Sequence, residues 1–368
     1  MANTPLVDSH MDTAALRLLV LCDRPSASQE VHLFRALRRM RGAGTCALAI
    51  FSEAAAADAQ RTNKNWVGQA IKRLRPHALL LSRFAGAGTG EAIRAAHVLG
   101  VPAITHIDDY LLEVPPDLGA DKVRHHMRPE RIKALTDSLA DADLLYVSTE
   151  PLAARVRRAG FATPIMISAL QSCADPEELA LPAPPAEGTV RIGYQGTRSH
   201  AHDLNMIAPA LLSAFAQRPH ATLELFGTIE PPEKLLALGP RLKSTPATPD
   251  YASFLTTLSQ RGWHLGLGPL RPIEFNTFRT YTKWTEYAIA GVPMLASDCE
   301  AYRPVMQDGA GLMVADEDWE RALLHAIDDA SARAAWINAA QRTLRTALTL
   351  EMQETQVLAM LQKAGAPA

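Results

Sequence analysis

Short apolar runs alternate with longer amphipathic patterns along the chain, and this alternation constrains the fold more than any other feature of the sequence. Short runs bounded by turn residues are typical of strands that are buried on both faces of a sheet. When such strands alternate with helices, they favour β-α units around a parallel sheet over a helical bundle or a sandwich. The sequence therefore predicts an α/β protein.

The alternation occurs in two series, which predicts two Rossmann-like, doubly wound domains. The first series has expected strands at 16–22, 46–51, 78–82, 103–107 and 144–148, with helices at 29–41, 65–74, 90–99 and 129–140. The second has expected strands at 190–194, 222–226, 264–268, 293–296 and 311–314, with helices at 204–216, 251–260, 283–290 and 319–329. A long helical pattern over 331–361 closes the chain.

A stretch rich in proline separates the two series. Residues 181–188 read Leu-Pro-Ala-Pro-Pro-Ala-Glu-Gly, which cannot continue a helix or a central strand and is typical of a linker. We therefore predict an N-terminal domain over 1–180, a linker over 181–188, a C-terminal domain over 189–345 and a C-terminal helix over 346–368.

The composition is that of an ordinary soluble protein, with a formal net charge of -2 and 21% charged residues. Residues 1–13 lack the apolar centre of a signal peptide, and no apolar run approaches the roughly 20 residues that span a bilayer. We expect a cytoplasmic protein without a nucleic-acid partner. The cysteines are far apart and match neither zinc-ligand spacing nor a disulfide framework; they are Cys22, Cys46, Cys173 and Cys299.

Residues 31–76 carry nine basic side chains against two acidic ones, interleaved with Leu33, Phe34, Leu37, Met40 and Trp66. One interpretation is a solvated helix face above a buried apolar stripe. The other is a basic face that docks on anionic lipid or on an anionic acceptor, which would place the protein peripherally on the inner face of the membrane.

Three segments of the second series follow expected strands, where open α/β sheets bind ligands. In the first, a strand runs into Gly196, Thr197 and Arg198 and then into a helix. Backbone N–H groups at this turn could approach an anion, and the guanidinium of Arg198 could add a forked donor. Many joints of this kind are only tight turns.

The second and third segments form one block over 264–297, in which a strand enters a polar loop, a helix and another strand. Asn276, Thr277 and the helix N-terminus could hold a diphosphate with the ammonium of Lys283. Glu286, one turn beyond Lys283, suits a pair of ribose hydroxyls. The alternative is an ion pair between Lys283 and Glu286 on an exposed helix face.

Together, these segments resemble the nucleotide-binding half of GT-B glycosyltransferases, in particular the retaining group 1, or family 4-like, enzymes. In that group a Gly-Thr/Gly-Arg segment and a downstream lysine contact the donor diphosphate, and a glutamate in a Glu-Tyr/Ala-x-x-x-Gly-x-Pro block binds the ribose. The resemblance implies Arg198 and Lys283 on the diphosphate and Glu286 on the ribose. It also implies two domains that face each other across a cleft, with C-terminal helices that cross back to the first domain.

The sequence departs from the family pattern at one position. Members of the group commonly carry two glutamates with seven residues between them, and the earlier glutamate lies near the transferred sugar. In this chain the later glutamate is Glu286, and Phe278 occupies the position of the earlier one. Glu274 lies out of register, so either Glu274 or the pair Asn276 and Thr277 takes the contact with the sugar. Retention and inversion of configuration both remain open.

The first half is similar to the same family through residues 100–115 and 141–149. His106, Asp108 and Asp109 stand at the end of an expected strand, so we expect them to face the cleft as a general base or as orienting carboxylates. The alternative is that Asp108 or Asp109 caps the following segment.

We expect no metal and no cofactor other than the donor substrate. Asp108 and Asp109 lack the spacing of an Asp-x-Asp motif, and in the two-domain architecture fixed cations and helix N-termini offset the charge of the leaving group. His125 and His126 are neighbours, and neighbours on a helix point about 100 degrees apart.

The resemblance implies a metal-independent, hexosyltransferase-like enzyme that moves a sugar from a nucleoside-diphosphate sugar to a hydroxyl. The expected partners are the nucleotide sugar and a glycan or glycolipid acceptor, in polysaccharide, glycolipid or glycoconjugate assembly. The alternatives are a nucleotide-sugar 2-epimerase and a non-catalytic protein that binds glycan or acts as a scaffold.

Overall fold

The computed structural model describes residues 4–11, 14–23, 27–184 and 188–366, and these divide into two compact units. Unit 1 contains Met1–Val114, Val123–Gln171 and Leu350–Ala368. Unit 2 contains Pro115–Lys122 and Ser172–Thr349. The chain therefore enters unit 2 twice and returns to unit 1 at its end.

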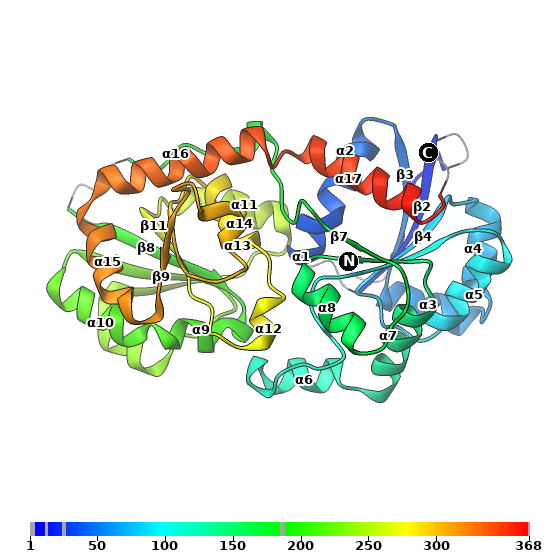
Figure 1. The fold of residues 1–368 in the computed structure, drawn as a ribbon, viewed down its shortest axis with the longest axis horizontal. Helices are drawn as coiled ribbons and strands as arrows, with labels where there is room; N and C mark the ends of the chain where they lie inside the picture. Colours follow the sequence, from blue (N-terminus) through cyan, green and yellow to red (C-terminus); the bar gives the residue numbers. More distant parts are fainter. Residues whose placement is uncertain (1–3, 12–13, 24–26, 185–187, 367–368) are drawn as a thin grey trace. The chain divides into compact units, whose positions relative to one another are not determined.

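Unit 1 is built on a parallel sheet with one antiparallel edge strand (Figure 1). In spatial order, its described strands are β1 (Leu6–Val7), β3 (Cys46–Ser52), β2 (Leu16–Cys22), β4 (Ala78–Ser82), β5 (Ala103–Ile107), β6 (Leu144–Val147) and β7 (Ile165–Ile167). Every strand of the first predicted series is present, and β4 and β5 are buried along their whole length.

Helices flank this sheet, and the first expected helix is interrupted. A π-helical turn, Glu30–Phe34, separates α1 (Ala27–Gln29) from α2 (Arg35–Gly42). The others in the described part of unit 1 are α3 (Glu53–Thr62), α4 (Trp66–Leu74), α5 (Thr89–Val98), α6 (Ala120–His126, which begins in unit 2), α7 (Pro129–Asp141), α8 (Glu150–Arg158) and α17 (Leu350–Lys363).

The C-terminal helix α17 belongs to unit 1, as the expectation of helices crossing back to the first domain requires. It lies beside α2 (Figure 1), and Val357, Met360 and Leu361 are buried in the same core as Leu37. The side-chain amide of Gln353 donates to the backbone oxygen of Val31 at 2.7 Å. Apolar burial and a buried hydrogen bond thus attach the end of the chain to its beginning.

Unit 2 has an entirely parallel sheet in its described part (Figure 1). In spatial order, the strands are β10 (Leu242–Pro246), β9 (Ala221–Gly227), β8 (Val190–Gly196), β11 (Leu265–Gly268), β12 (Met294–Ser297) and β13 (Leu312–Val314). Its α-helices are α9 (Ala201–Met206), α10 (Ala208–Gln217), α11 (Tyr251–Gln260), α12 (Glu274–Thr277), α13 (Thr282–Ile289), α14 (Arg303–Met306), α15 (Trp319–Asp328) and α16 (Ala330–Thr346).

The segment before β8 packs on unit 2. The backbone N–H of Ala180 donates to the oxygen of Ile289 at 2.7 Å, and the side-chain amide of Gln341 donates to the oxygen of Ala180 at 2.7 Å. The contacts place the boundary between the units at Gln171 and Ser172, ahead of the predicted linker. Residues 185–187 of that linker lie outside the described residues.

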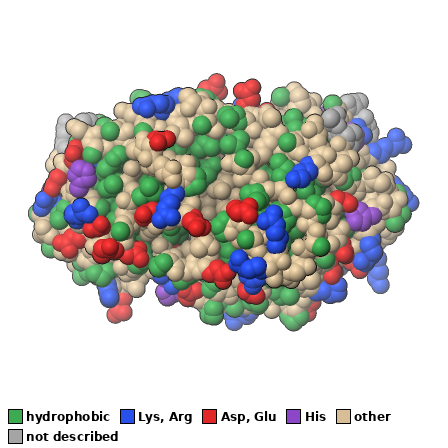
Figure 2. All heavy atoms as spheres, in the orientation of Figure 1, with side chains coloured by type: hydrophobic (Ala, Val, Ile, Leu, Met, Phe, Trp, Pro, Cys, Tyr) green, Lys and Arg blue, Asp and Glu red, His purple; other side chains and the backbone are tan. Residues whose placement is uncertain are grey.

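The apolar side chains of the basic segment over 31–76 form a buried stripe, as the interpretation of a solvated helix face expects. The core residues among them include Leu33, Phe34, Leu37 and Met40. Four arginines among the described residues of this segment form ion pairs: Arg38 with Glu30, Arg39 with Glu354, Arg41 with Asp8 and Arg61 with Asp58. Acidic and basic side chains are interspersed on the face that Figure 2 shows. The expected contact with a membrane stays a prediction; among the described helices, none has the length and apolar character needed to cross a bilayer.

Candidate functional site

The three predicted segments of unit 2 meet at one edge of its sheet. β8 pairs with β11 and β11 pairs with β12, all parallel, so their carboxyl ends point the same way. A glycine turn follows β8 and a polar loop follows β11. Helix α13 connects that loop to β12. This edge is where doubly wound sheets bind ligands.

Lys283 lies in the first turn of α13 and is buried, with 9% of its surface exposed. Its Nζ donates to the backbone oxygen of Gln195 at the end of β8 and lies 4.4 Å from the ring centroid of Tyr194. Burial lowers the pKa of Lys283 to about 8, although the charges of Glu286 and Asp203 act in the opposite direction. At neutral pH the amine is therefore a poorly hydrated cation, which an anion would stabilise.

Glu286 is also buried, at 3% exposure, so Lys283 and Glu286 do not form the exposed-face ion pair of the alternative interpretation. Its Oε2 accepts a hydrogen bond from Nε2 of Gln195 at 2.6 Å. The backbone N–H of Gln195 donates to the hydroxyl of Tyr287 at 3.1 Å. Gln195, which the sequence analysis did not single out, therefore joins the end of β8 to both functional side chains of α13.

Asp203, on α9, ties the turn after β8 to the loop after β11. It is 2% exposed, and its Oδ1 accepts from the backbone N–H of Arg271 at 3.1 Å and from Nδ2 of Asn276 at 3.2 Å. Its Oδ2 lies 3.3 Å from Nδ1 of His200. Burial raises the pKa of Asp203, but His200 and Arg271 lower it more, so the carboxylate stays charged.

The residues proposed for the donor sugar lie on α12. Asn276 is buried, and besides Asp203 its Nδ2 donates to the backbone oxygen of Arg271 at 3.0 Å. Thr277 is exposed, and its hydroxyl donates to the backbone oxygen of Glu274, which is exposed as well. A cavity of about 270 Å³ is lined by Asn276 and Thr277 together with Ser297. Asn276 thus positions the loop, while Thr277 and Glu274 remain accessible.

The glycine turn after β8 holds Gly196, Thr197 and Arg198, but Arg198 does not join Lys283. The Arg198 side chain is 72% exposed, and its Nε lies 3.2 Å from Oε1 of Glu230. The hydroxyl of Thr197 lies 2.9 Å from that of Ser199. Among the contacts of the described residues, none links Arg198 to Lys283.

Another cation whose charge reaches Lys283 is Arg279, which was not among the predicted site residues. Its positive charge lowers the pKa of both Lys283 and His200. Its guanidinium lies 5.1 Å from the ring centroid of Phe275. The signal was present in the sequence, because Arg279 precedes Lys283 by four positions just ahead of α13. The resemblance drew attention to Arg198 instead.

In unit 1, His106, Asp108 and Asp109 lie in a buried polar cluster at the end of β5. Nδ1 of His106 lies 3.0 Å from the hydroxyl of Ser82, and burial lowers the pKa of His106 to about 3. The guanidinium of Arg83 pairs with Asp108 and lies 3.4 Å from Asp109. Burial raises the pKa of Asp108, but the positive charge of Arg83 opposes this effect. The resulting pKa lies well below its usual range. These partners favour an orienting role over that of a general base.

Comparisons with known proteins show which solved structures this chain resembles. Neither a protein-family model nor a curated protein sequence matches the chain. Among solved structures, HepE of Anabaena in complex with UDP has a TM-score of 0.64 at 12% identity, over 94% of this chain and 100% of that one. A UDP-forming trehalose-phosphate synthase of Burkholderia xenovorans has a TM-score of 0.60 at 12% identity, over 96% and 100%. TarM of S. aureus, solved with UDP, has a TM-score of 0.58 at 11% identity, over 80% and 58%.

At these identities the likeness establishes architecture. It extends over nearly the whole length of the chain in the first two structures, and so it includes both parallel sheets. The chain has the GT-B fold, which the resemblance of its sequence implied.

Proposed function

We propose that the chain is a glycosyltransferase that moves a sugar from a nucleoside-diphosphate sugar to a hydroxyl acceptor. The observation that carries the proposal is the pair of buried side chains Lys283 and Glu286, both bonded to Gln195 where β8 ends. A cation and a carboxylate at this edge match the two polar parts of a nucleotide, its diphosphate and its ribose. The fold supports the proposal, because the HepE structure was solved with UDP and the trehalose-phosphate synthase is UDP-forming.

In this proposal, catalysis is mainly electrostatic. The leaving diphosphate takes negative charge when the bond to the sugar breaks, and the ammonium of Lys283 and the guanidinium of Arg279 stabilise that charge. Both groups are already desolvated in part and held in place, so little reorganisation is needed at the moment of reaction. Glu286 accepts from the ribose hydroxyls and fixes the position of the nucleotide.

Arg279 replaces Arg198 as the second cation on the diphosphate. Arg198 is mostly exposed and its nearest anionic partner is Glu230, whereas the charge of Arg279 acts directly on Lys283. Asn276 and Asp203 hold the loop that carries Thr277 and Glu274, which we propose as the groups near the transferred sugar. UDP sugars are the first donors to test.

Several finer properties belong to the proposal as well. They are a hexosyl group as the sugar, metal-independent transfer, a glycan or glycolipid as the acceptor, and a cytoplasmic location with peripheral contact to the membrane. His106, Asp108 and Asp109 orient the loop after β5 on the acceptor side of the reaction.

The test is the substitution Lys283→Ala. Loss of one pre-oriented charge on a developing anion lowers turnover by about a hundredfold or more. The fold should survive, since the amine of Lys283 bonds to a single backbone oxygen. Thermal unfolding is followed with and without UDP, because a ligand of the native state raises its stability. Wild-type protein should melt higher with UDP, and the variant should gain little.

Lys243→Ala is the matched control, because Lys243 is exposed on β10 of the same unit. Incubation of a UDP sugar with and without a glycan acceptor distinguishes transfer from epimerisation, since an epimerase makes a new nucleotide sugar from the donor alone. Equal stabilisation of the wild type and of Lys283→Ala by UDP would remove Lys283 from the site. A wild type that binds no nucleotide would instead favour the scaffold.

A further inference from the structure

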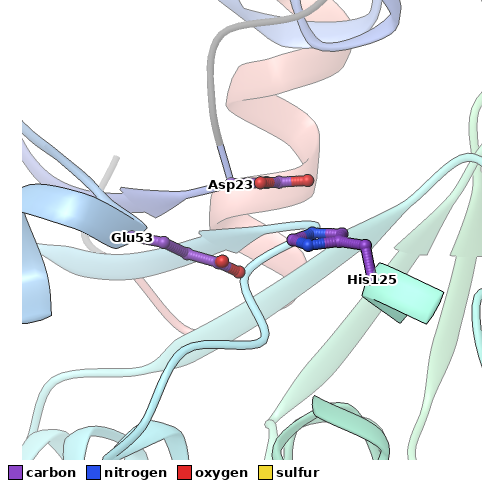
Figure 3. A group of neighbouring side chains, drawn as sticks. All are labelled: Asp23, Glu53 and His125. Carbon is purple, nitrogen blue, oxygen red and sulfur yellow. The ribbon is translucent and has the colours of Figure 1, made fainter. Parts of the chain in front are cut away.

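A second polar cluster lies in unit 1, at the carboxyl edge of its sheet. Asp23 directly follows β2, and Glu53 directly follows the neighbouring parallel strand β3. His125, on α6, lies against both. Figure 3 shows the three side chains converging, and one ligand atom of each lies within 4.8 Å of the other two. Among the described residues, no other group of this kind brings its ligand atoms so close together.

Glu53 is held in place by two further contacts. Its Oε1 accepts from the backbone N–H of Ala85 at 2.8 Å, and its Oε2 pairs with Nη1 of Arg131. A carboxylate oxygen has two lone pairs, so these bonds fix the orientation of Glu53 and leave positions for another ligand. Outer contacts of this type are the usual support of metal-ligating carboxylates.

A buried arginine beside the cluster has spare hydrogen-bond donors. Arg131 is 8% exposed, and its Nε and Nη2 have no hydrogen-bond partner among the described residues. A cation would balance the two carboxylates, and an anion or water bound to that cation would satisfy the spare donors of Arg131.

We propose that Asp23, Glu53 and His125 bind one divalent transition-metal cation of the Mn²⁺ or Zn²⁺ class. Two carboxylate oxygens and one imidazole nitrogen are a donor set that both ions accept, whereas Mg²⁺ and Ca²⁺ prefer oxygen alone. Ligand bonds of about 2.0–2.2 Å bring neighbouring ligand atoms to about 3–4 Å, so the side chains close by about 1 Å around the ion. The site is separate from the donor site and does not depend on the proposed function.

This proposal departs from the expectation of no metal in the chain, which rested on residues that are neighbours in the sequence. Asp108 with Asp109 and His125 with His126 were the pairs in question. The fold instead brings His125 to two carboxylates from distant parts of unit 1. Sequence spacing therefore gave no sign of this cluster.

The experiment titrates MnCl₂ into the full chain after treatment with a chelator and follows free Mn²⁺ by electron paramagnetic resonance. We expect one equivalent of bound Mn²⁺ that ZnCl₂ displaces, together with a higher melting temperature. Asp23→Asn and His125→Gln should each weaken Mn²⁺ binding at least tenfold, and neither variant should gain thermal stability from Mn²⁺. Glu53 is left unchanged because it also anchors the backbone at Ala85.

The controls are Asp58→Asn, a substitution on the same helix as Glu53, and His97→Gln, at an exposed histidine. Both should bind Mn²⁺ as the wild type does. Circular dichroism without metal shows whether each variant is folded. If one of the two ligand substitutions, Asp23→Asn or His125→Gln, prevents folding, the other still tests the binding of Mn²⁺. The proposal is overturned if the wild type binds no Mn²⁺, or if Asp23→Asn and His125→Gln bind it as tightly as the controls.

Discussion

At the scale of single residues, the candidate site depends on a lysine that is kept charged where water is largely excluded. The amine of Lys283 has a backbone oxygen and an aromatic face as neighbours, and Glu286 contributes negative charge from one turn away. Removing a cation from water costs free energy, and burial accordingly lowers the pKa of Lys283. An arriving diphosphate offsets that cost, which makes the residue sensitive to both ligand and pH.

This sensitivity gives a pH prediction. The pKa of Lys283 is about 8 in the free protein, so the amine is mostly charged below pH 8 and becomes neutral above it. If the charged form is required, kcat/KM should be constant near pH 7 and fall by about tenfold per pH unit above pH 8, since this ratio reports the free enzyme. Lys283→Arg, always charged, should show lower activity without that fall. A flat wild-type profile up to pH 10 would contradict the assignment.

At the scale of elements, the glycine turn after β8 depends on its neighbour β9. The backbone N–H of Thr228 donates to the oxygen of Gly196 at 3.1 Å. Gly227, at the end of β9, has a φ of +123°, and a Cβ there would lie 2.2 Å from that same oxygen. The turn is therefore held by a close approach that only glycine permits.

Gly227→Ala should consequently displace Gly196 and weaken the binding of UDP by about tenfold, or about 1.4 kcal/mol. Gly239→Ala is the control, because Gly239 also has a positive φ, +53°, but no atom lies within 4 Å of its added Cβ. That substitution should cost about 1–3 kcal/mol of stability through backbone strain alone and leave UDP affinity unchanged. Calorimetry with UDP and urea unfolding measure the two effects. Equal UDP affinity in both variants would show that the turn does not depend on Gly227.

The elements also show which parts of the fold the sequence could predict. The buried strands were found because a strand covered on both faces is usually a nearly continuous apolar run, as at 78–81 and 144–147. β10 was missed, since it is an edge strand of sequence Leu-Lys-Ser-Thr-Pro whose side chains are largely exposed. Its parallel pairing with β9 comes from backbone hydrogen bonds, which leave no apolar pattern.

At the scale of the whole molecule, the order of the sequence does not match the order of the units. α17 follows all of unit 2 in the sequence and yet completes the core of unit 1. Gln356 on this helix donates to the hydroxyl of Tyr146 at 2.6 Å. The last residues of the chain therefore support a sheet that was formed by its first half.

A substitution in α17 should accordingly destabilise unit 1. Leu361 is 1% exposed, and Leu361→Ala should cost about 2–5 kcal/mol, the usual range for a buried leucine. Leu358, on the same helix and 39% exposed, is the control and should cost less than about 1 kcal/mol when replaced by alanine. Hydrogen exchange would locate the effect: amides of β2 and β4 should exchange faster, and those of β8 and β11 should not. Faster exchange confined to unit 2 would contradict this view of α17.

The sequence by itself determined the two series of buried strands and the block that carries Lys283 and Glu286, because local apolar patterns and neighbouring positions on one helix are visible along the chain. The tertiary structure alone decided which distant side chains meet. It joined Gln195 to α13, placed Arg279 where its charge reaches Lys283, and brought Asp23, Glu53 and His125 together. Parallel strands place their carboxyl ends at one edge of a sheet whatever their separation in sequence, so these contacts follow from strand order, which no local pattern encodes.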